Sequence, residues 1–275
     1  LDSNLMQPFP VDINSAVDKL AAQYQLTQEQ QQAIREVLEK MDEKHLSARL
    51  ACVASLVSAG ARVADIGSDH AYLPAALVLD GKIDFAIAGE VVKGPYENAV
   101  HEIKDHQLEG QVIPRLADGL AAIEPADKVD TITIAGMGGS LIASILEKDK
   151  NKLTGIKRLV LQPNVGESQL REWLMNNHYQ IMNEKIIEED NHIYEIIVAE
   201  PSVVPFRYSK YELDFGPFLL ENKGPVFRKK WQEYLQREAH VIDQMQKAQQ
   251  PPVKKINEIN QFLSQVKEAI ADDNR

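Results

Sequence analysis

One stretch of the sequence, residues 63–74 (VADIGSDHAYLP), places an apolar run with an acidic residue directly before a glycine and a helix-like segment. We interpret residues 63–66 as a buried strand, Gly67 as a tight turn and residues 71–79 as the following helix. In a doubly wound α/β sheet the chain leaves the first strand in this way and forms a nucleotide site at the next helix N-terminus. The stretch therefore predicts an α/β fold with a ligand site at this turn.

The turn departs from the dinucleotide-binding fingerprint, which has glycine at three positions. Only the first position, Gly67, is glycine, whereas Asp69 occupies the second and Tyr72 the third. A carboxylate at Asp69 would repel a pyrophosphate. The turn therefore argues against NAD or FAD and favours a ligand without phosphates. S-adenosylmethionine, with its adenosine and its positively charged sulfonium, meets that requirement.

Strand-like and helix-like segments alternate along the middle of the chain. The expected strands are 62–66, 83–89, 111–116, 129–135 and 157–162, and the expected helices are 71–79, 95–108, 139–148 and 167–177. Two further apolar runs, 179–188 and 192–199, flank Asp190-Asn191 and suit an antiparallel hairpin. The pattern predicts a Rossmann-like, seven-stranded sheet with one reversed strand, which is typical of class I methyltransferases.

The C-terminal part of the chain has a different pattern. Residues 201–217 contain three prolines and little periodicity, and we interpret them as a linker. Apolar residues then recur at three- and four-residue steps on both sides of Pro251-Pro252. This spacing predicts an antiparallel coiled-coil hairpin over residues 218–275.

The N-terminal part carries no chemical motif. Residues 1–40 are expected to form two helices, the second with Thr27 as its N-cap and Gln30 three residues later. The chain begins with Leu, and Met41 is a plausible alternative start. We interpret residues 1–40 as a helical extension outside the functional unit; a peripheral helical hairpin is the alternative. Residues 41–200 would then be the S-adenosylmethionine-binding domain.

Composition and charge narrow the class of protein. The single cysteine, Cys52, excludes an internal disulfide, and no cysteine or histidine spacing suggests a metal site, so we expect no metal. No run of 18 apolar residues and no signal peptide is visible, so we expect a cytoplasmic protein without membrane contact. The net charge of −11 argues against a general nucleic-acid coat, although residues 223–275 carry ten Lys and Arg against seven Asp and Glu.

Three acidic residues follow successive strands at the predicted ligand-binding edge. Asp65 can order the first turn by accepting backbone N–H bonds. Glu90 ends the second strand, where a carboxylate can accept bonds from both hydroxyls of a ribose, and Asp118 follows the third, where it can accept one from an adenine amine. One such acid alone is typical of a solvated loop, but three in succession predict a nucleoside site.

The end of the fourth strand lacks the polar-Pro-Pro-aromatic motif that often binds the target base in amino-methyltransferases. Residues 135–140 read AGMGGS, whose glycines either let the backbone approach a ligand or simply open the next helix. The fifth strand ends with Gln162 and Asn164, whose amides suit either a base edge or a structural turn.

Two further residues near the predicted site have open roles. Arg49 lies in an expected amphipathic helix over residues 45–57, where it either contacts a ligand carboxylate or an RNA phosphate, or remains a solvated charge. His70 is either a base at the ligand site or a helix-start residue with a local hydrogen bond.

A basic patch opens the first C-terminal helix. Arg228, Lys229 and Lys230 precede Trp231, and aromatic residues lie between the charges. Such a patch suits contact with RNA phosphates. The alternative is a coiled-coil surface with Trp231 in the seam between the helices.

Taken together, six segments resemble one known family. They are 65–74 (DIGSDHAYLP), 88–90 (AGE), 118–120 (DGL), 133–139 (TIAGMGG), 161–164 (LQPN) and 216–219 (GPFL). In this order and spacing, across roughly residues 41–272, they resemble the bacterial tRNA (adenine-22-N1)-methyltransferases, the TrmK family. The resemblance implies a Rossmann-like S-adenosylmethionine domain with a C-terminal coiled coil, which methylates N1 of an adenine in the D-arm of tRNA.

With this resemblance we assign roles to the candidate residues. The expected cofactor-binding residues are Asp65, Gly67, His70, Glu90, Asp118, Gly119, Gly136 and Met137. The expected tRNA-binding residues are Arg49, Gln162, Asn164, Arg228, Lys229 and Lys230. We expect a monomer that acts on tRNA. The alternatives are a methyltransferase for another RNA, a small molecule or a protein, and a non-catalytic S-adenosylmethionine-binding module.

Asp69 is the candidate catalytic residue. It can accept a hydrogen bond from the adenine N6 amine and stabilise the cation that forms at N1. Two alternatives are a bond to the ammonium group of S-adenosylmethionine and a role as the N-cap of helix 71–79.

Overall fold

The computed structural model describes residues 21, 26–28, 30–32 and 46–271. The chain divides into two units, Leu1–Leu46 and Ser47–Arg275. Most of the two helices expected within residues 1–40 lies outside the described residues. The predicted cap of the second is confirmed, because Thr27 N donates to Gln30 Oε1 at 2.9 Å and Gln30 N donates to Thr27 Oγ1 at 3.3 Å.

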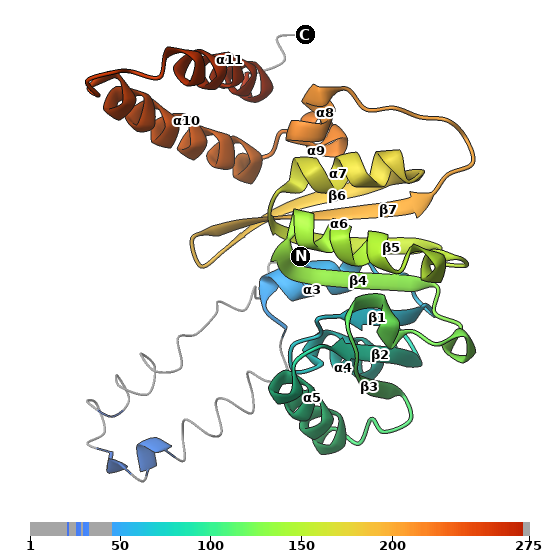
Figure 1. The fold of residues 1–275 in the computed structure, drawn as a ribbon. Helices are drawn as coiled ribbons and strands as arrows, with labels where there is room; N and C mark the ends of the chain where they lie inside the picture. Colours follow the sequence, from blue (N-terminus) through green and yellow to red (C-terminus); the bar gives the residue numbers. More distant parts are fainter. Residues whose placement is uncertain (1–20, 22–25, 29, 33–45, 272–275) are drawn as a thin grey trace, which may run out of the picture. The chain divides into compact units, whose positions relative to one another are not determined.

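A seven-stranded sheet in the order β3-β2-β1-β4-β5-β7-β6 organises the second unit (Figure 1). Its strands are β1 (Arg62–Ile66), β2 (Phe85–Glu90), β3 (Val112–Leu116), β4 (Thr131–Gly138), β5 (Arg158–Val165), β6 (Tyr179–Glu189) and β7 (His192–Pro201). The first five are parallel, and β7 is antiparallel to both β5 and β6. The predicted sheet with one reversed strand is therefore confirmed.

Helices connect these strands as the alternating pattern predicts. They are α3 (Ala48–Leu56), α4 (Tyr72–Leu79), α5 (Lys93–Asp105), α6 (Gly139–Lys148) and α7 (Glu167–Asn176), with 3-10 turns η1 (Gly119–Ala122), η2 (Pro125–Asp127) and η3 (Lys150–Leu153). The pattern works because parallel strands are covered on both faces and are almost wholly apolar. In β1 and β2, for example, every residue after the first is buried.

One face of the sheet packs into the main apolar core. Ile132 and Leu161 on the strands belong to the same buried cluster as Ile142 of α6 and Leu170 of α7. Since successive residues of a strand point to opposite faces, the neighbours of these residues must point the other way.

The opposite face carries polar side chains near the carboxyl ends of the strands. Asp65 pairs in register with both Ala88 and Thr133, and Thr133 pairs with Val160. Paired residues share a face, as do residues two positions apart. The polar side chains that share this face are Asp65, Glu90, Thr133 and Gln162.

The expected linker is partly helical, which corrects the prediction for residues 201–217. It contains α8 (Lys210–Phe215), in which Ser209 and Glu212 form a capping box. Leu213 is 5% exposed and Phe215 is fully buried. The helix is too short to show periodicity in the sequence, but its capping box was a readable signal.

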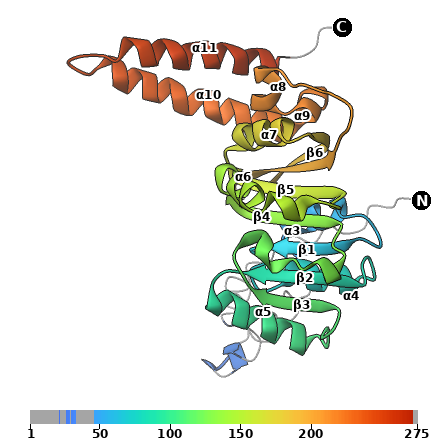
Figure 2. The same ribbon diagram turned by 45° about the vertical axis from the view of Figure 1, so that its right-hand side comes forward.

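Three more helices follow: α9 (Pro217–Glu221), α10 (Pro225–Gln246) and α11 (Val253–Ile270). Helices α10 and α11 lie side by side as a hairpin, and Pro251 and Pro252 lie in the connection between them (Figure 2). An aromatic cluster that includes Phe215, Trp231 and Phe262 joins the base of this hairpin to α8. Coiled-coil packing along its full length stays a prediction, as does its independence from the sheet domain.

Within the described part of the chain, no helix combines the length and the apolar character needed to cross a membrane.

Candidate active site

The carboxyl ends of the five parallel strands bring most of the predicted site residues to one edge of the sheet. Asp65 lies near the end of β1, before the turn that runs to His70, Glu90 is the last residue of β2, and Asp118 and Gly119 follow β3. Gly136 and Met137 are among the last residues of β4, and Gln162 and Asn164 lie near the end of β5. β1 and β4 are the neighbours at which the strand order reverses, and open α/β sheets bind ligands at such a switch point.

Asp65 is held inside the sheet by hydroxyl groups. It is 4% exposed, and it accepts hydrogen bonds from Ser68 Oγ and Thr133 Oγ1, both at 2.6 Å. These hydroxyls take the place of the backbone N–H donors that we expected. Burial is the main reason that the pKa of Asp65 rises to about 6, and the two hydroxyls partly oppose that rise.

Thr133 was missed as a site residue by the sequence reasoning. Its signal was a hydroxyl residue between Ile132 and Ile134 in a strand buried on both faces. A buried polar group must find a partner, so a threonine there predicts a bond across the sheet.

Gly67 is favoured at the first turn by its positive φ, and it lies close to the flexible end of Met137. Its φ is +72°, and a Cβ added there would lie 2.0 Å from Met137 Cε. The turn of β1 and the end of β4 therefore pack closely and bring Gly67 and Met137, two of the expected cofactor-binding residues, together.

The next three residues are backbone outliers. Asp69, His70 and Ala71 have φ values of 35°, 63° and 58°. Non-glycine residues rarely adopt positive φ, and strained backbone of this kind is concentrated at functional sites. Helix α4 begins only at Tyr72, with Ala71 as its N-cap and no side-chain cap bond. The interpretation of Asp69 as the helix cap is therefore wrong.

Of the three side chains of this strained turn, those of Asp69 and His70 are accessible, whereas Ala71 is fully buried. The Asp69 side chain is 83% exposed, and its Oδ1 lies 3.6 Å from His70 Nε2. The His70 ring stacks on Tyr72 with centroids 5.1 Å apart, and its Nε2 lies 3.4 Å from Asn98 Nδ2. His70 thus has the local contacts of the helix-start alternative, while it still lies at the ligand edge.

Glu90 connects the strained turn to β2. It is 6% exposed, and its Oε1 accepts a hydrogen bond from Asp69 N at 2.5 Å. Burial raises the pKa of Glu90, and the Asp69 N–H bond partly opposes that rise. This places a carboxylate with few partners beside the turn, as a ribose diol would require.

Asp118 lies in a more open position. Its Oδ2 pairs with Lys148 Nζ at 2.5 Å, and the two side chains are 62% and 59% exposed. Gly119 has a φ of +57° and packs against Ile145 of α6. An adenine amine at Asp118 would therefore share the carboxylate with a solvated ion pair.

A hydrogen-bonded network organises the ends of β4 and β5. Gln162 Oε1 accepts from Gly136 N at 2.9 Å and from an Arg49 guanidinium nitrogen at 2.7 Å. Gln162 Nε2 donates to Asn164 Oδ1 at 3.1 Å, and Asn164 Nδ2 donates to Gly136 O at 2.8 Å. Gly136 has a φ of +80° at an irregular point of β4, so the two amides hold a bulge at the edge of the site.

This network changes the expected roles of its members. Gln162 is fully buried and bonded on both sides, so it positions its neighbours instead of reaching a base directly. Asn164 is exposed and lies next to the bulge. Arg49, which sequence reasoning left open between surface and site, lies at the site.

The basic patch lies elsewhere and is engaged within the protein. Arg228 donates to the carbonyls of Lys223 at 3.2 Å and Ile270 at 2.5 Å, and Lys229 pairs with Glu188. Trp231 is 6% exposed and packs in the aromatic cluster, which is the arrangement of the alternative interpretation.

Lys230 belongs to a buried charge network, which we define as Arg171, Glu184, Glu195 and Lys230. Arg171 is fully buried between Glu184, at 2.7 Å, and Glu195. Lys230 Nζ lies 2.7 Å from Glu195 and 2.6 Å from Glu167. These ion pairs tie α10 to α7 and to the β6–β7 hairpin.

The segment 216–219 also serves this network. Phe218 N donates to Glu184 Oε2 at 2.9 Å. A Cβ on Gly216 would lie 2.7 Å from Glu184 Oε2 and 2.8 Å from an Arg171 nitrogen. The glycine therefore leaves room for the buried ions.

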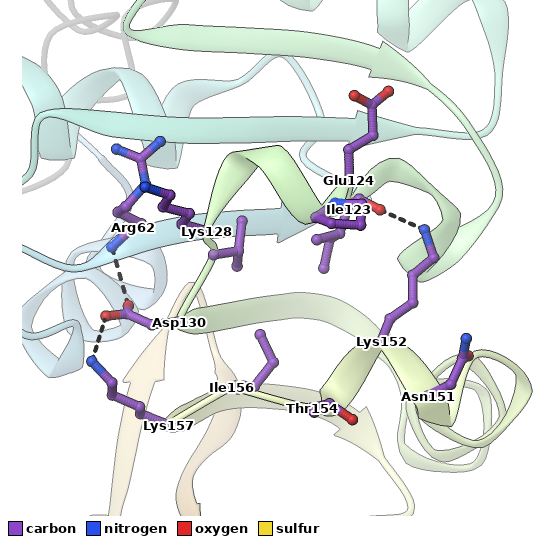
Figure 3. Close-up of a pocket in the computed structure, with 13 residues that line it drawn as sticks. Arg62, Ile123, Glu124, Lys128, Asp130, Asn151, Lys152, Thr154, Ile156 and Lys157 are labelled. Carbon is purple, nitrogen blue, oxygen red and sulfur yellow. Dashed lines mark hydrogen bonds and ion pairs between the residues drawn. The ribbon is translucent and has the colours of Figure 1, made fainter.

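A cavity of about 710 Å³ lies at the opposite edge of the sheet (Figure 3). Arg62 at the start of β1, Asp130 before β4 and Lys157 before β5 line it, and Asp130 bonds to both of the others. This cavity is separate from the candidate active site, because those residues lie at the amino ends of the strands and the site lies at the carboxyl ends.

The chemistry of the site edge fits S-adenosylmethionine. Glu90 and Asp118 can accept hydrogen bonds from a ribose diol and an adenine amine. The turn of residues 67–71, where a dinucleotide-binding fold would bind a phosphate, contains no lysine or arginine. Among the described residues there is also no group of three His, Cys, Asp or Glu side chains that could hold a metal ion.

The strand order, the single reversed strand and the acidic carboxyl edge define a methyltransferase of class I architecture. Within that class the chain belongs to the TrmK family. The family model, described as tRNA (adenine(22)-N(1))-methyltransferase, matches residues 63–268.

Individual relatives agree with this assignment. The chain is 42% identical over 236 residues to the tRNA (adenine(22)-N(1))-methyltransferase of Bacillus subtilis (strain 168), which covers 84% of this chain and 99% of that protein. A putative tRNA (m1A22) methyltransferase of Streptococcus pneumoniae, solved in complex with S-adenosyl-L-methionine, is 44% identical with a TM-score of 0.77 and covers 82% of this chain and 100% of its own. M. capricolum TrmK in complex with S-adenosyl-homocysteine is 28% identical with a TM-score of 0.73, covering 82% of this chain and 97% of its own.

Proposed function

We propose that this protein methylates N1 of adenine 22 in the D-arm of tRNA with S-adenosylmethionine as the methyl donor. Membership of the TrmK family supports the reaction and the substrate. The observation that carries the proposal is the buried carboxylate of Glu90 beside the strained turn of β1. This carboxylate provides a hydrogen-bond acceptor for a ribose, and the adjacent turn has no lysine or arginine that would bind a phosphate.

The residues that hold the cofactor follow from the edge of the sheet. Glu90 accepts from the ribose hydroxyls, Asp118 accepts from the adenine amine, and Gly67 lets the backbone of the turn approach the ligand. Asp65 stabilises this turn from inside the sheet through Ser68 and Thr133. When bound, the cofactor supplies a methyl group on a positively charged sulfonium.

The protein has little proton chemistry to perform. Adenine N1 has an in-plane lone pair, so no strong base is needed to create the nucleophile. The main contribution is therefore positioning, which can supply a large share of the rate enhancement. Asn164 bonds to the edge of the target base. Gln162, itself held by Arg49, donates a hydrogen bond to Asn164 and so fixes its orientation.

Asp69 contributes charge. An exposed carboxylate next to the turn can accept from the adenine N6 amine and stabilise the cation that forms on methylation. Adenine N1 lies on the Watson–Crick edge and is hidden in paired RNA, so the target base must leave its stack.

The helical hairpin docks the body of the tRNA. Residues 223–275, which include both helices of this hairpin, carry a net charge of +3, from ten Lys and Arg against seven Asp and Glu. Because Lys230 is only 21% exposed and pairs with two carboxylates, Arg228 and Lys229 are the members of the basic patch that we retain as phosphate contacts. We also propose that the protein acts as a monomer in the cytoplasm, where tRNA is its substrate.

The direct test uses tRNA from cells that lack this protein. After incubation with the purified protein and S-adenosylmethionine, digestion to nucleosides should yield 1-methyladenosine, and tRNA with guanine at position 22 should yield none. Equal yields from both tRNAs, or no 1-methyladenosine from either, would overturn the proposal.

A further inference from the structure

A column of side chains leads from the candidate active site to the protein surface. The Arg49 guanidinium, which holds Gln162, lies over the Tyr194 ring with 5.6 Å between Cζ and the ring centroid. The Tyr194 ring in turn stacks with the ring of His192, with centroids 6.3 Å apart and planes inclined by 25°. The column therefore begins at the β4–β5 bulge and ends at an exposed histidine.

The register of the sheet supports this placement independently. β5 and β7 are antiparallel, and Leu161 pairs with Ile197. Asn164 lies three residues after Leu161, and Tyr194 lies three residues before Ile197, so both project from the opposite face to that pair. This is the face that carries Gln162 and the other polar site residues. Tyr194 is thus on the same side of the sheet as Asn164, one strand further out.

The charge of Arg49 is not used within the column. Among residues 46–271, no acidic side chain forms an ion pair with its guanidinium, which bonds to a neutral amide and lies over a neutral ring. Glu189 bonds instead to the backbone N–H groups of Ala48 and Arg49 at the start of α3. A half-buried cation that forms no ion pair and lies at one end of two successive aromatic rings suits a nucleotide, because an aromatic ring stacks with a base and a cation binds a phosphate.

The conformation of the β6–β7 turn keeps the histidine in place. Asp190 and Asn191 have φ values of 49° and 61°, as a tight two-residue hairpin turn requires. His192 Nδ1 lies 2.9 Å from Asp190 O, which orients the ring at the mouth of the column. The outer end is therefore a shaped aromatic surface.

We propose that Arg49, Tyr194 and His192 form a stacking platform for a nucleotide of the tRNA strand that adjoins the target adenine. This proposal rests on the proposed function, and it adds the residues that hold the displaced strand. The neighbouring base stacks on the exposed ring of His192, which Tyr194 supports, and the phosphate backbone of the strand runs toward Arg49. Tyr194 is thus a positioning residue, since it holds the strand and does not take part in methyl transfer.

The test compares two substitutions of Tyr194 by direct binding and by fluorescence. Tyr194→Leu removes the ring, and Tyr194→Phe keeps it. The probe is a tRNA with 2-aminopurine next to the target adenine, because stacking on an aromatic ring quenches this base. The Leu variant should lose the quenching and bind tRNA roughly tenfold more weakly. The Phe variant should behave as the wild type, and both should bind S-adenosylmethionine normally.

Phe206→Leu is the matched control. Phe206 also pairs with a second ring, that of Tyr208 at 5.5 Å, but it follows β7 near the opposite edge of the sheet. This change should leave tRNA binding and quenching unaltered. Normal quenching and affinity in Tyr194→Leu would overturn the platform, whatever the methylation assay shows. Absence of 1-methyladenosine with quenching that depends on Tyr194 would overturn the proposed function and leave the platform in place.

Discussion

Two regions of this molecule hold their buried carboxylates in different ways. At the carboxyl edge of the sheet, Asp65 is bonded only to hydroxyls, and burial raises its pKa to about 6. In the buried charge network, burial also acts on Glu195, but Lys230 and Arg171 outweigh it and lower the pKa of that carboxyl. At Asp65 the cost of burial is offset in part, mainly by hydroxyl bonds, whereas in the network cations outweigh that cost at Glu195 and only partly offset it at Glu184, whose pKa stays raised.

This difference in how buried carboxylates are held distinguishes a ligand-binding site from a structural ion-pair network. A buried ion pair with good geometry holds elements together, and its groups have no remaining capacity for a ligand. Uncompensated buried charges cost stability and are retained where a ligand will use them or their surroundings. By this criterion the turn of β1 is the functional region, and the network is the structure that fixes the helical hairpin relative to the sheet.

The largest expected effect on stability comes from breaking the buried charge network. Arg171→Met should lower the free energy of unfolding by about 3–5 kcal/mol, because it leaves Glu184 and Glu195 buried with less compensation. Urea denaturation measures this loss. Lys93→Met is the control, since it breaks an exposed pair with Glu97 and should cost about 0.3–0.5 kcal/mol.

A second change sharpens the same experiment. Adding Glu184→Gln to Arg171→Met removes one of the stranded charges and should restore part of the lost stability. A single-variant loss as small as that of the Lys93 control would show that the network is not buried as a structural joint.

At the carboxyl edge of the sheet, the cost of burying the charge of Asp65 should make the free energy of unfolding depend on pH. The folded pKa of Asp65, about 6, lies above its ordinary value of 3.8, so protonation favours the folded state. That contribution is fully present below about pH 4 and is lost as the pH rises through 6. Relative to Asp65→Asn, the wild type should therefore lose about 3 kcal/mol of stability across this window.

Thr133→Val makes this prediction more specific. The Thr133 hydroxyl bond lowers the pKa of Asp65, so its removal should move the stability loss to higher pH. The measurement is the free energy of unfolding at several pH values between 4 and 8. Parallel profiles for the wild type and Asp65→Asn would show that Asp65 does not carry an uncompensated charge.

The two regions also differed in how far they could be predicted from sequence. The turn of β1 was readable because its strand, glycine and acid are contiguous, and the carboxyl ends of parallel strands must meet at one edge. Each member of the charge network looked like a surface charge, because its partners lie 13 and 24 residues away from Arg171 and further still from Lys230. Only the three-dimensional pairing shows that these charges are buried.

Within the candidate site, the predicted strands gave the positions of the site residues along the sheet edge more reliably than the contacts that their side chains make. Gln162 was identified correctly as a residue of the site edge, but its full burial depends on Arg49 and Gly136 from other elements. The positive φ of three consecutive non-glycine residues after Gly67 could not be read from their side chains. Local strain of this kind is stabilised by the surrounding fold, not by the residues that carry it.

Glu90→Ala tests whether the open region binds the cofactor. Loss of a charge-assisted acceptor should weaken S-adenosylmethionine binding by about 1.5–3 kcal/mol, which is roughly 10- to 150-fold. Calorimetric titration measures the affinity, and Glu97→Ala on the exposed face of α5 provides the control. Unchanged affinity in Glu90→Ala would remove the ribose assignment.

Asp69 lies in the turn of β1 but is not one of the buried carboxylates, since its side chain is 83% exposed and does not cap α4. The structure leaves two roles: stabilising the methylated base, or bonding to the cofactor's ammonium group. We expect the first, and at this exposure a charge about 4 Å from a cation contributes about 1 kcal/mol, so Asp69→Asn should lower kcat about five- to tenfold. The cofactor affinity should stay near normal, as should both quantities in Asp84→Asn, an exposed acid before β2. Weakened cofactor binding with an unchanged kcat at saturation would instead assign Asp69 to the ammonium group, and would show that the turn's carboxylates all serve the cofactor.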